Sequence, residues 1–419
     1  MGGTGDAPIP DTVVVVGAGV VGLSTAWFLQ EYGIRVTVVD RGRVGSGASW
    51  GNAGWLSPGL ALPINEPRIL AYGPRALADP RAPLSIPDPA APGLTRFLAG
   101  FAWNSRPRAW QHALEGTLPL NRGCLDAYDL LGDSGVDVAS TAAPITALFS
   151  SPRSAAHLLA ELRQSTRAGL PLEFAPLSSA QVHEALPQAS GSVRAGVRIM
   201  GQRYLDPGLF TQALAESVRR RGGAIVEEFE VSALESDSSA LTVRSQHGET
   251  ESAEAVVAAT GAWMRRQAHS WGIRVPLAAG RGYSFLAPTT DPVPTPVYLP
   301  EVRVACTPFR AGLRVAGTME FDSPDASMRS TRPRRIAESA GRYLEIAGLE
   351  ERTNEWVGPR PVTADGLPLV GRTRIPGLFT AGGHGMWGLT QGPVTGRLLA
   401  EAIGTGKPPP DLAPLDPLR

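Results

Sequence analysis

The first 40 residues carry the clearest change of hydrophobic spacing in the chain. A continuous β-branched run at residues 13–16 is typical of a buried strand, and a glycine-rich turn and a helical stretch follow it. A second β-branched run then ends at Asp40. This order predicts a β-α-β unit, the element from which nucleotide-binding sheets are built.

Helical spacing recurs in the middle of the chain. Apolar side chains at residues 153–168 follow a helical period, and the stretch 206–221 opens with Asp-Pro, which favours a helix start. Between residues 71 and 119 prolines are frequent and periodicity is poor, apart from one helix expected in the segment GLTRFLAGFAW. We therefore expect a second structural unit to begin in this proline-rich region.

The second half of the chain alternates between strand-like and mixed segments. After residue 221, the segments GAIVEEFEVSAL, LTVRSQ and AEAVVAATGAW have strand character and are expected to extend the first sheet. Residues 276–354 contain prolines and short β-branched or aromatic runs, and they end in a helix expected at 334–347. The last section returns to strand, glycine loop and helix, which predicts that the chain crosses back to its first unit.

Composition narrows the class of protein. With 419 residues, of which 43% are hydrophobic and 19% charged, the chain is long enough for two globular units. Lys+Arg and Asp+Glu both number 39, so the net charge gives no electrostatic reason to expect nucleic acid or an anionic membrane as a partner. We expect a small-molecule partner instead.

The chain shows no sign of export or of a disulfide framework. Its start lacks the basic and apolar segments of a secretion signal, and no apolar run approaches the roughly 20 residues that a membrane-spanning helix needs. Cys124 and Cys306 lack the spacing of a metal site or a disulfide scaffold. We expect a cytoplasmic protein with reduced thiols, no metal and no transmembrane segment; peripheral contact with the inner face of the membrane stays open.

Three glycines mark a nucleotide site. Gly17, Gly19 and Gly22 form a GxGxxG pattern between the first strand and the helix, where missing side chains permit a tight turn and close approach of a pyrophosphate. Asp40, at the end of the second strand, is placed to accept hydrogen bonds from an adenosine ribose. Strand, helix and acidic residue together predict a bound dinucleotide.

The end of the chain distinguishes FAD from NAD. An NAD enzyme reads its cofactor with the N-terminal unit alone, whereas the segment TAGGHGMWGLTQGPVTGRLLAEA is expected to bring the C-terminal region back to the nucleotide. A helix that begins near residues 391–393 would direct its positive end toward the negative charge of a reduced flavin. The sequence therefore favours a flavin cofactor, FAD.

On these segments the chain resembles the D-amino-acid oxidase superfamily, and within it the bacterial D-amino-acid dehydrogenase branch. The matching pieces cover nearly the full length in the family's order: VVVVGAGVVGLSTAWFL, SGASWGNAGWLSPG, RYLDPGLF, VVAATGAW, RGYSF, RVAGTMEF, GPRPVTADGLPLVG and GGHGMWGLT. The resemblance implies a two-domain α/β fold. We expect a Rossmann-like FAD-binding domain from residues 12–57, 203–275 and 355–408, a mixed β-sheet substrate-binding domain from 58–202 and 276–354, and flexible tails at 1–11 and 409–419.

The resemblance also distributes FAD contacts along the chain. The segment after the second strand would cross the flavin diphosphate, with Trp55 and Leu56 facing the ring edge or the substrate; the alternative is that Trp50 and Trp55 only fill the core. Trp263 would close over the nucleotide or pack in the core. The full set of expected FAD-binding residues is Gly17, Gly19, Val20, Val21, Gly22, Asp40, Arg41, Ala48, Ser49, Asn52, Ala53, Gly54, Leu56, Val231, Thr260, Gly261, Trp263, Gly383, Gly385, Met386, Gly388, Leu389 and Thr390.

Four residues are candidates for substrate chemistry. Arg360 matches the family's carboxylate-binding arginine, with a surface ion pair as the alternative; a guanidinium can hold a carboxylate through two hydrogen bonds. Arg281 and Tyr283 fall where the family places residues near the reactive face of the flavin or the site entrance. Tyr283 would bind the carboxylate or satisfy its hydroxyl at a domain seam. His384 is a candidate general base, but its glycine loop favours a supporting role beside the flavin.

The resemblance implies FAD-dependent oxidation of a C–N bond in an amino acid. A hydride would pass from the amine-bearing carbon to flavin N5, and the resulting imine would hydrolyse to a 2-oxo acid and ammonia. The early glycine-rich segment has no histidine and no cysteine follows Cys306, so noncovalent FAD is expected. A quinone, a carrier or O2 would accept the electrons.

Other functions stay open at this point. One is a glycine/sarcosine-type oxidase that acts on a secondary or N-substituted amine with O2, and another is a noncatalytic FAD-binding subunit of a hetero-oligomer. A flavin hydroxylase fed by NAD(P)H is disfavoured, because the late loop reads AGGHG without the usual aspartate and no second GxGxxG is present.

Overall fold

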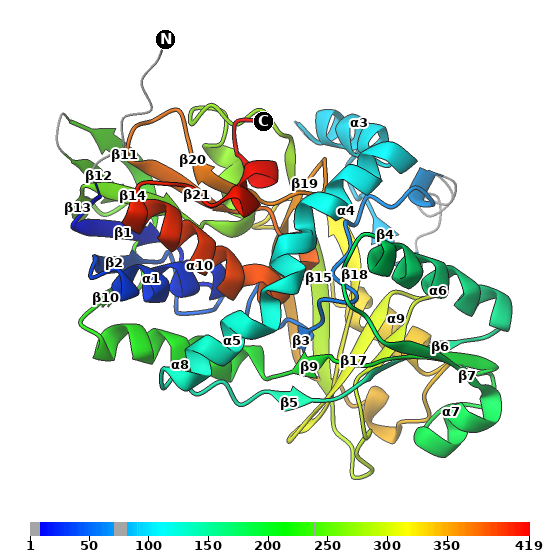
Figure 1. The fold of residues 1–419 in the computed structure, drawn as a ribbon. Coiled ribbons are helices and arrows are strands. Elements are labelled where there is room, and N and C mark those ends of the chain that lie inside the picture. Colours follow the sequence, from blue (N-terminus) through cyan, green and yellow to red (C-terminus); the bar gives the residue numbers. More distant parts are fainter. Residues whose placement is uncertain (1–8, 71–81, 90, 92, 238–239) are drawn as a thin grey trace.

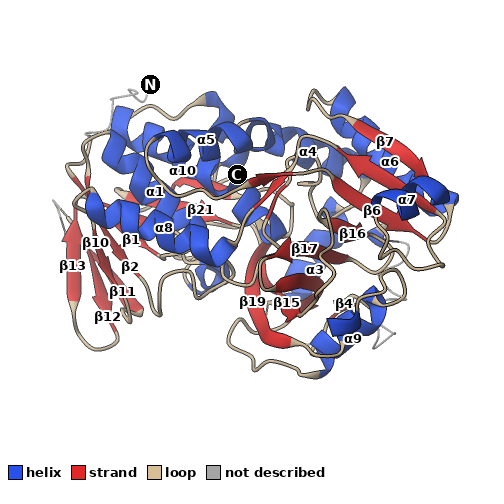
Figure 2. Cartoon of the chain, turned by 90° about the horizontal axis from the view of Figure 1, so that it is seen from below, coloured by secondary structure: helices blue, strands red, loops and turns tan. Residues whose placement is uncertain are grey.

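Two sheets of different type organise the chain (Figures 1 and 2). The computed structural model describes residues 9–70, 82–89, 91, 93–237 and 240–419. A six-stranded sheet holds the N-terminal unit together with the end of the chain, and a nine-stranded sheet lies beside it. The expected α/β class is confirmed.

The six-stranded sheet has the form of a nucleotide-binding sheet. Its strands lie in the order β10 (Ala224–Val226), β2 (Arg35–Val39), β1 (Thr12–Val16), β14 (Ala255–Ala258), β21 (Leu378–Gly382) and β20 (Leu369–Arg372). All neighbours are parallel except β20 and β21. Because central parallel strands bury both faces, the continuous apolar run of β1 belongs in the middle of this sheet.

Helix α1 (Val20–Glu31) packs against both α8 (Pro207–Arg220) and α10 (Gly388–Thr405) on this sheet (Figure 1). A Cβ at Gly396 would lie 2.6 Å from the carbonyl carbon of Ser24, so this glycine permits the close crossing of α10 and α1. The Trp27 indole donates to Ser217 Oγ at 3.0 Å and links α1 to α8. The first and last parts of the chain therefore share one core.

The three segments expected to extend the first sheet do so only in part. β10 and β14 join it, whereas β11 (Val231–Ser236), β12 (Leu241–Ser245) and β13 (Thr250–Ala253) form a separate antiparallel sheet. In β12 buried and half-buried residues alternate, so the strand has one face to bury rather than two. Leu241 and Val243 pack on the face of the first sheet that includes Val14.

The nine-stranded sheet is mixed. Its order is β19 (Thr353–Thr363), β15 (Leu277–Ala287), β18 (Gly312–Phe321), β17 (Val304–Phe309), β16 (Val297–Leu299), β6 (Ile145–Phe149), β8 (Ala195–Ile199) and β7 (Phe174–Ser178), with β4 (Leu84–Ser85) beside β18. Most of its strands come from segments expected in the substrate-binding domain. β19 does not, because it pairs with β15 over most of its length although residues 355–408 were expected in the other domain.

A smaller three-stranded sheet joins β3 (Trp55–Leu56), β9 (Arg203–Tyr204) and β5 (Thr141–Ala142). The helices at residues 153–168 and 206–221 were located correctly, as α6 (Pro152–Arg167) and α8, and GLTRFLAGFAW lies in α3 (Leu94–Asn104). Helix α9 (Thr331–Ala340) begins and ends before the helix expected at 334–347, and α7 (Ser179–Ala185) is one further short helix.

Helix α4 (Pro107–Arg122) lies mostly in the region 71–119, where poor periodicity was expected, and helix α5 (Cys124–Asp133) follows it. Pro107 begins α4, and Trp110, Leu114 and Leu118 recur every four residues and are buried. Tyr128 of α5 donates to the Leu389 carbonyl of α10 at 2.6 Å. These helices thus pack on the nucleotide-binding core, although residues 58–202 were expected in the substrate-binding domain; residues 71–81 lie outside the described residues.

The end of the chain is not the flexible tail expected at residues 409–419. A 3-10 helix at Pro410–Leu415 buries Leu412 and Leu415 in the core shared by α1 and α10. The Arg419 guanidinium pairs with Asp365 at 2.8 Å. The two buried leucines hold this segment in place, although its polar and proline-rich composition indicates a flexible tail. Across the described residues, the helices are too short or too polar to cross a membrane.

Candidate active site

The carboxyl ends of β1, β14 and β21 lie side by side. The parallel register pairs Val16 with Ala258, and Ala258 with Thr380. The loops that follow these strands are consequently brought to one edge of the sheet, at residues 17–22, 259–261 and 383–388. In open α/β sheets this edge is where ligands bind.

Two glycines of the first loop permit its close contacts. Gly17 has φ 118°, and a Cβ there would lie 2.4 Å from the Ala259 carbonyl oxygen. A Cβ at Gly22 would lie 1.9 Å from the Gly17 carbonyl oxygen. Any side chain at either position would force the loop, or the start of α1, away from the neighbouring backbone.

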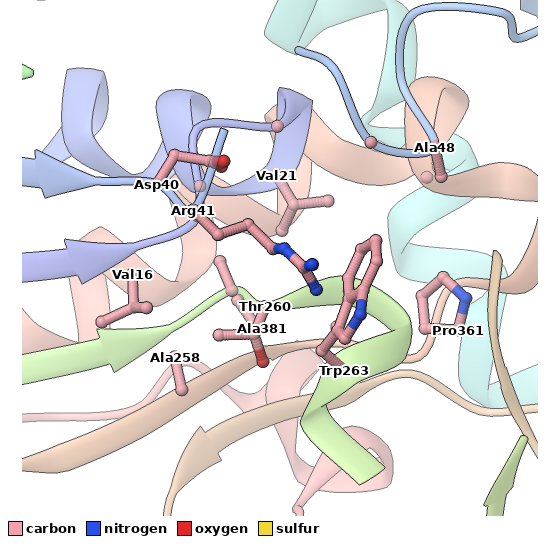
Figure 3. A pocket seen from close by; sticks show the side chains of 18 of the residues that line it. Val16, Val21, Asp40, Arg41, Ala48, Ala258, Thr260, Trp263, Pro361 and Ala381 are labelled. Carbon is pink, nitrogen blue, oxygen red and sulfur yellow. The ribbon is translucent and has the colours of Figure 1, made fainter. Parts of the chain in front are cut away.

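A cavity of about 410 Å³ opens at this edge (Figure 3). Most of the expected FAD-binding residues line it: Gly17, Gly19, Val20, Val21, Gly22, Asp40, Arg41, Ala48, Ser49, Asn52, Val231, Thr260, Gly261, Trp263, Gly385, Met386, Gly388 and Leu389. Arg360 and His384 line it as well. Ala53, Gly54, Leu56, Gly383 and Thr390 are not among the lining residues.

Two of the expected FAD-binding residues outside the lining hold the early segment in place through hydrogen bonds. Leu205 donates its backbone N–H to the Gly54 carbonyl at 2.9 Å, and Thr390 donates its hydroxyl to the Trp55 carbonyl at 3.0 Å. Trp55 is buried and donates to Thr307 Oγ1 at 2.8 Å, whereas Trp50 is 47% exposed. The two tryptophans of the early segment therefore have different surroundings, and neither lines the cavity.

Several lining residues were not found from the sequence. Phe229, Leu234 and Val243 come from the separate β11–β13 sheet and the loop before it, Trp271 follows the 3-10 helix at Gly261–Arg266, and Pro359 and Pro361 flank Arg360. The two prolines were visible in the GPRPVT segment. The others carry no motif, and packing of the small sheet on the first sheet brings Phe229, Leu234 and Val243 to the cavity.

Asp40 stabilises the glycine loop and faces the cavity (Figure 3). Its carboxylate accepts from the backbone N–H of Ala18 at 2.6 Å and of Gly42 at 2.8 Å. Burial raises the pKa of Asp40, although both hydrogen bonds oppose the shift. Since each carboxylate oxygen carries two lone pairs, capacity remains for the hydroxyls of a ribose.

Arg41 and Trp263 form one wall of the cavity (Figure 3). The Arg41 guanidinium lies 4.6 Å from the centre of the Trp263 ring. Asp325 joins them, because it accepts from the Trp263 indole at 2.9 Å and from Arg41 at 3.2 Å. Trp263 thus lines the cavity and is held in place by Asp325. Its contact with the nucleotide stays a prediction.

Two helices direct their N-termini at the cavity. Neither α1 nor α10 has an acidic residue in its first turn or a side-chain cap from its N-cap residue, and the first helical N–H of α1 donates to Ser49 Oγ at 3.1 Å. α10 begins at Gly388, a few residues before the start expected near 391–393. The positive end of a helix attracts anions, so α1 fits a diphosphate and α10 fits the charge of a reduced flavin.

Arg360 is a cation without an acidic partner among the described residues. Its Nη1 donates to the Thr318 carbonyl at 3.0 Å, and the guanidinium makes no second hydrogen bond to the described residues. Burial lowers the pKa of Arg360 to about 10, which leaves it protonated at neutral pH. Thr318 itself has φ 63°, a conformation that costs a β-branched residue about 1–3 kcal/mol.

His384 is buried beside the start of α10. Its Nε2 lies 2.9 Å from Thr395 Oγ1, and its Nδ1 has no partner within the described residues. Burial lowers the pKa of His384 to about 4, so the ring is neutral at pH 7 and a weak base. These surroundings agree with a supporting role better than with proton transfer.

Arg281 and Tyr283 do not line the cavity. Both are fully buried and bind Glu320: Tyr283 donates its hydroxyl at 2.8 Å and Arg281 donates from Nη1 at 3.2 Å. Arg332 donates to the other carboxylate oxygen at 3.1 Å. Because side chains alternate along a strand, the residue of the RGYSF motif that faces Arg360 is Gly282, not its two neighbours.

The parallel sheet, the glycine loop, the helix N-termini and the cavity define a dinucleotide-binding protein. Residues 12–402 match the family described as FAD dependent oxidoreductase (DAO), and the chain belongs to this family. FAD is therefore its cofactor and oxidation–reduction its chemistry. The expected family and cofactor are confirmed.

Curated relatives and solved structures agree with this family. A D-amino acid dehydrogenase of Xanthobacter autotrophicus is 30% identical over 97% of this chain and 98% of its own, and one of a Methylobacterium species is 32% identical over 95% and 96%. Glycine oxidase from Geobacillus kaustophilus has the same fold, with a TM-score of 0.74, 24% identity and 98% of each chain covered. L-proline dehydrogenase from P. horikoshii follows with a TM-score of 0.73, 18% identity and coverage of 99% and 98%.

Replacement of Tyr283 by phenylalanine is expected to lower the free energy of unfolding by about 1–3 kcal/mol, because buried Glu320 loses a donor. Substrate affinity should stay unchanged. Tyr204→Phe is the matched control, since no hydrogen bond of its hydroxyl occurs within the described residues. Urea unfolding of both variants tests this; a large rise in KM with unchanged stability would restore a catalytic role for Tyr283.

The depressed pKa of His384 predicts a pH-dependent stability. The folded protein holds the ring neutral down to about pH 4, whereas the unfolded chain takes up a proton near pH 6.5, so stability is complete above pH 6.5 and falls as the pH drops toward 4. Relative to His384→Gln, the wild type should lose roughly 2 kcal/mol more between pH 7 and pH 5. The free energy of unfolding of both proteins is measured in urea at the two pH values. An equal loss in the wild type and in His384→Gln would contradict the assignment.

Proposed function

We propose that the chain is a D-amino-acid dehydrogenase-like enzyme. It binds FAD noncovalently and oxidises the C–N bond of an amino acid, and the imine product hydrolyses to a 2-oxo acid and ammonia. Electrons pass on to a quinone or another carrier. Relatives at about 30% identity over nearly the whole chain that are named D-amino acid dehydrogenase support this proposal.

The observation that carries the proposal is the unpaired charge of Arg360. Among the described residues no carboxylate neutralises this guanidinium, yet it lines the same cavity as the glycine loop and the start of α10. An unpaired, partly buried cation is costly unless a ligand supplies the opposite charge. An amino-acid carboxylate does so, and its charged hydrogen bonds contribute about 1.5–3 kcal/mol each.

Different residues of the chain would bind the diphosphate, the ribose and the flavin of FAD and the carboxylate of the substrate. The start of α1 would hold the diphosphate, and Asp40 would accept hydrogen bonds from the ribose of the same FAD. The start of α10 would stabilise negative charge on the flavin. Bound FAD supplies the hydride acceptor, while Arg360 fixes the carboxylate and so limits the positions available to the amine-bearing carbon.

Anaerobic mixing with a panel of substrates tests the function. The FAD-loaded protein is treated with D-amino acids, L-amino acids and N-substituted glycines, and the visible absorption of the oxidised flavin is followed. Loss of absorption with D-amino acids is expected. Reduction by N-substituted glycines alone would favour the secondary-amine oxidase, and no reduction across the panel would favour the noncatalytic subunit.

Truncation of the arginine tests the carboxylate site. Arg360→Ala is expected to raise KM for the amino acid by about 10- to 100-fold and to leave FAD affinity unchanged. Arg352→Ala is the matched control, because this arginine precedes β19 and is already paired with Glu355 at 3.2 Å. Equal loss of FAD and substrate affinity in the Arg360 variant would remove the assignment.

A further inference from the structure

The guanidinium of Arg360 lies over Gly282 of β15, the strand paired with its own strand β19. Gly282 of β15 and Gly358 of β19 are paired in register, so no side chain rises from either position. A Cβ at Gly358 would come within 2.0 Å of the Trp356 indole, and a Cβ at Gly282 would come within 1.9 Å of Arg360 Nη2 and 2.0 Å of Cζ. The guanidinium therefore occupies the volume that Gly282 leaves empty.

The backbone carbonyl of Thr318 on β18, the strand on the other side of β15, accepts a hydrogen bond from the guanidinium. The pairing of β15 with β18 shifts register between Arg281 and Tyr283, which places an irregularity opposite Gly282. Thr318 lies in this irregularity with φ 63°, and its carbonyl oxygen accepts from Arg360 Nη1 at 3.0 Å. The unusual backbone conformation thus directs a carbonyl at one particular nitrogen of the arginine.

We propose that Gly282 and Thr318 are positioning residues that fix the orientation in which the Arg360 guanidinium meets the substrate. The Thr318 carbonyl accepts from one N–H of Nη1, which holds the guanidinium in place and leaves its other N–H groups for a carboxylate. This inference rests on the proposed function, in which Arg360 binds the substrate carboxylate. It adds that a glycine and a backbone carbonyl, neither of which touches the substrate, set the preference for an acid over a neutral ligand.

The test compares a carboxylate with its neutral amide. Propanoate and propanamide are titrated into the FAD-loaded protein, and each Kd is read from the change in the flavin absorption spectrum, so no turnover is needed. The wild type is expected to bind propanoate at least about 10-fold more tightly than propanamide. In Gly282→Ala the new Cβ displaces the guanidinium, and the ratio should fall to about 2 or less.

Gly280→Ala is the matched control. It lies two residues away on the same face of β15, and its Cβ would meet Met319 Sδ at 2.2 Å and Val362 Cγ2 at 2.9 Å rather than Arg360. It therefore crowds the strand to a similar extent but should keep the wild-type ratio. An equal fall of the ratio in both variants, or an unchanged ratio in Gly282→Ala, would overturn the proposal.

Two variants of Thr318 test the carbonyl independently of Gly282. Thr318→Pro fixes φ near −65° and turns the carbonyl away, so the preference for propanoate should be lost. Thr318→Gly accepts φ 63° without strain and should retain the preference that the proline variant loses. Equal ratios in these two variants would contradict the role of the carbonyl, and retained FAD in each shows that the fold is intact.

Failure of this inference can be told from failure of the proposed function. If no amino acid reduces the wild-type flavin, the proposed function fails whatever the binding ratios are. If amino acids reduce the wild type and Gly282→Ala still prefers propanoate, the function stands and the positioning role is wrong. A wild type without preference for propanoate overturns the positioning role directly.

Discussion

The parallel register of β1, β14 and β21 is the constraint on which the site depends. These strands come from the start, the middle and the end of the chain, and their pairing brings three distant loops to one edge of the sheet. Gly17 permits the closest of these approaches, because any side chain there would collide with the backbone that follows β14. Close crossing of α1 and α10 through Gly396 then holds the two ends of the chain together.

The nine-stranded sheet contributes a positive charge that no carboxylate among the described residues neutralises. Arg360 stands on β19, and an isolated bridge between Val362 and His384 ties this strand to the loop after β21. One short contact thus couples the strand that carries the arginine to the loop at the start of α10. By contrast, Arg281, Arg332 and Tyr283 are bound to buried Glu320, so they hold the second sheet together and do not line the cavity.

The features predicted from sequence are those with a local physical cause. The GxGxxG turn, the strand ending at Asp40 and the return of the C-terminal segment each follow from spacing within a few residues, and all reach the cavity. The predictions failed where tertiary contacts decide: the β11–β13 sheet, helix α4 and the packed C-terminus. In RGYSF the arginine and tyrosine carry the chemistry that a sequence can show, whereas strand alternation turns the glycine between them toward Arg360.

A crystal structure of the FAD-loaded protein with propanoate bound is the most direct test of the central claim. One FAD should contact the loops at residues 17–22, 259–261 and 383–388 together, with its ring on the side of the cavity where Arg360 holds the carboxylate. An FAD that leaves residues 383–388 without contact, or a carboxylate bound away from Arg360, would contradict the account.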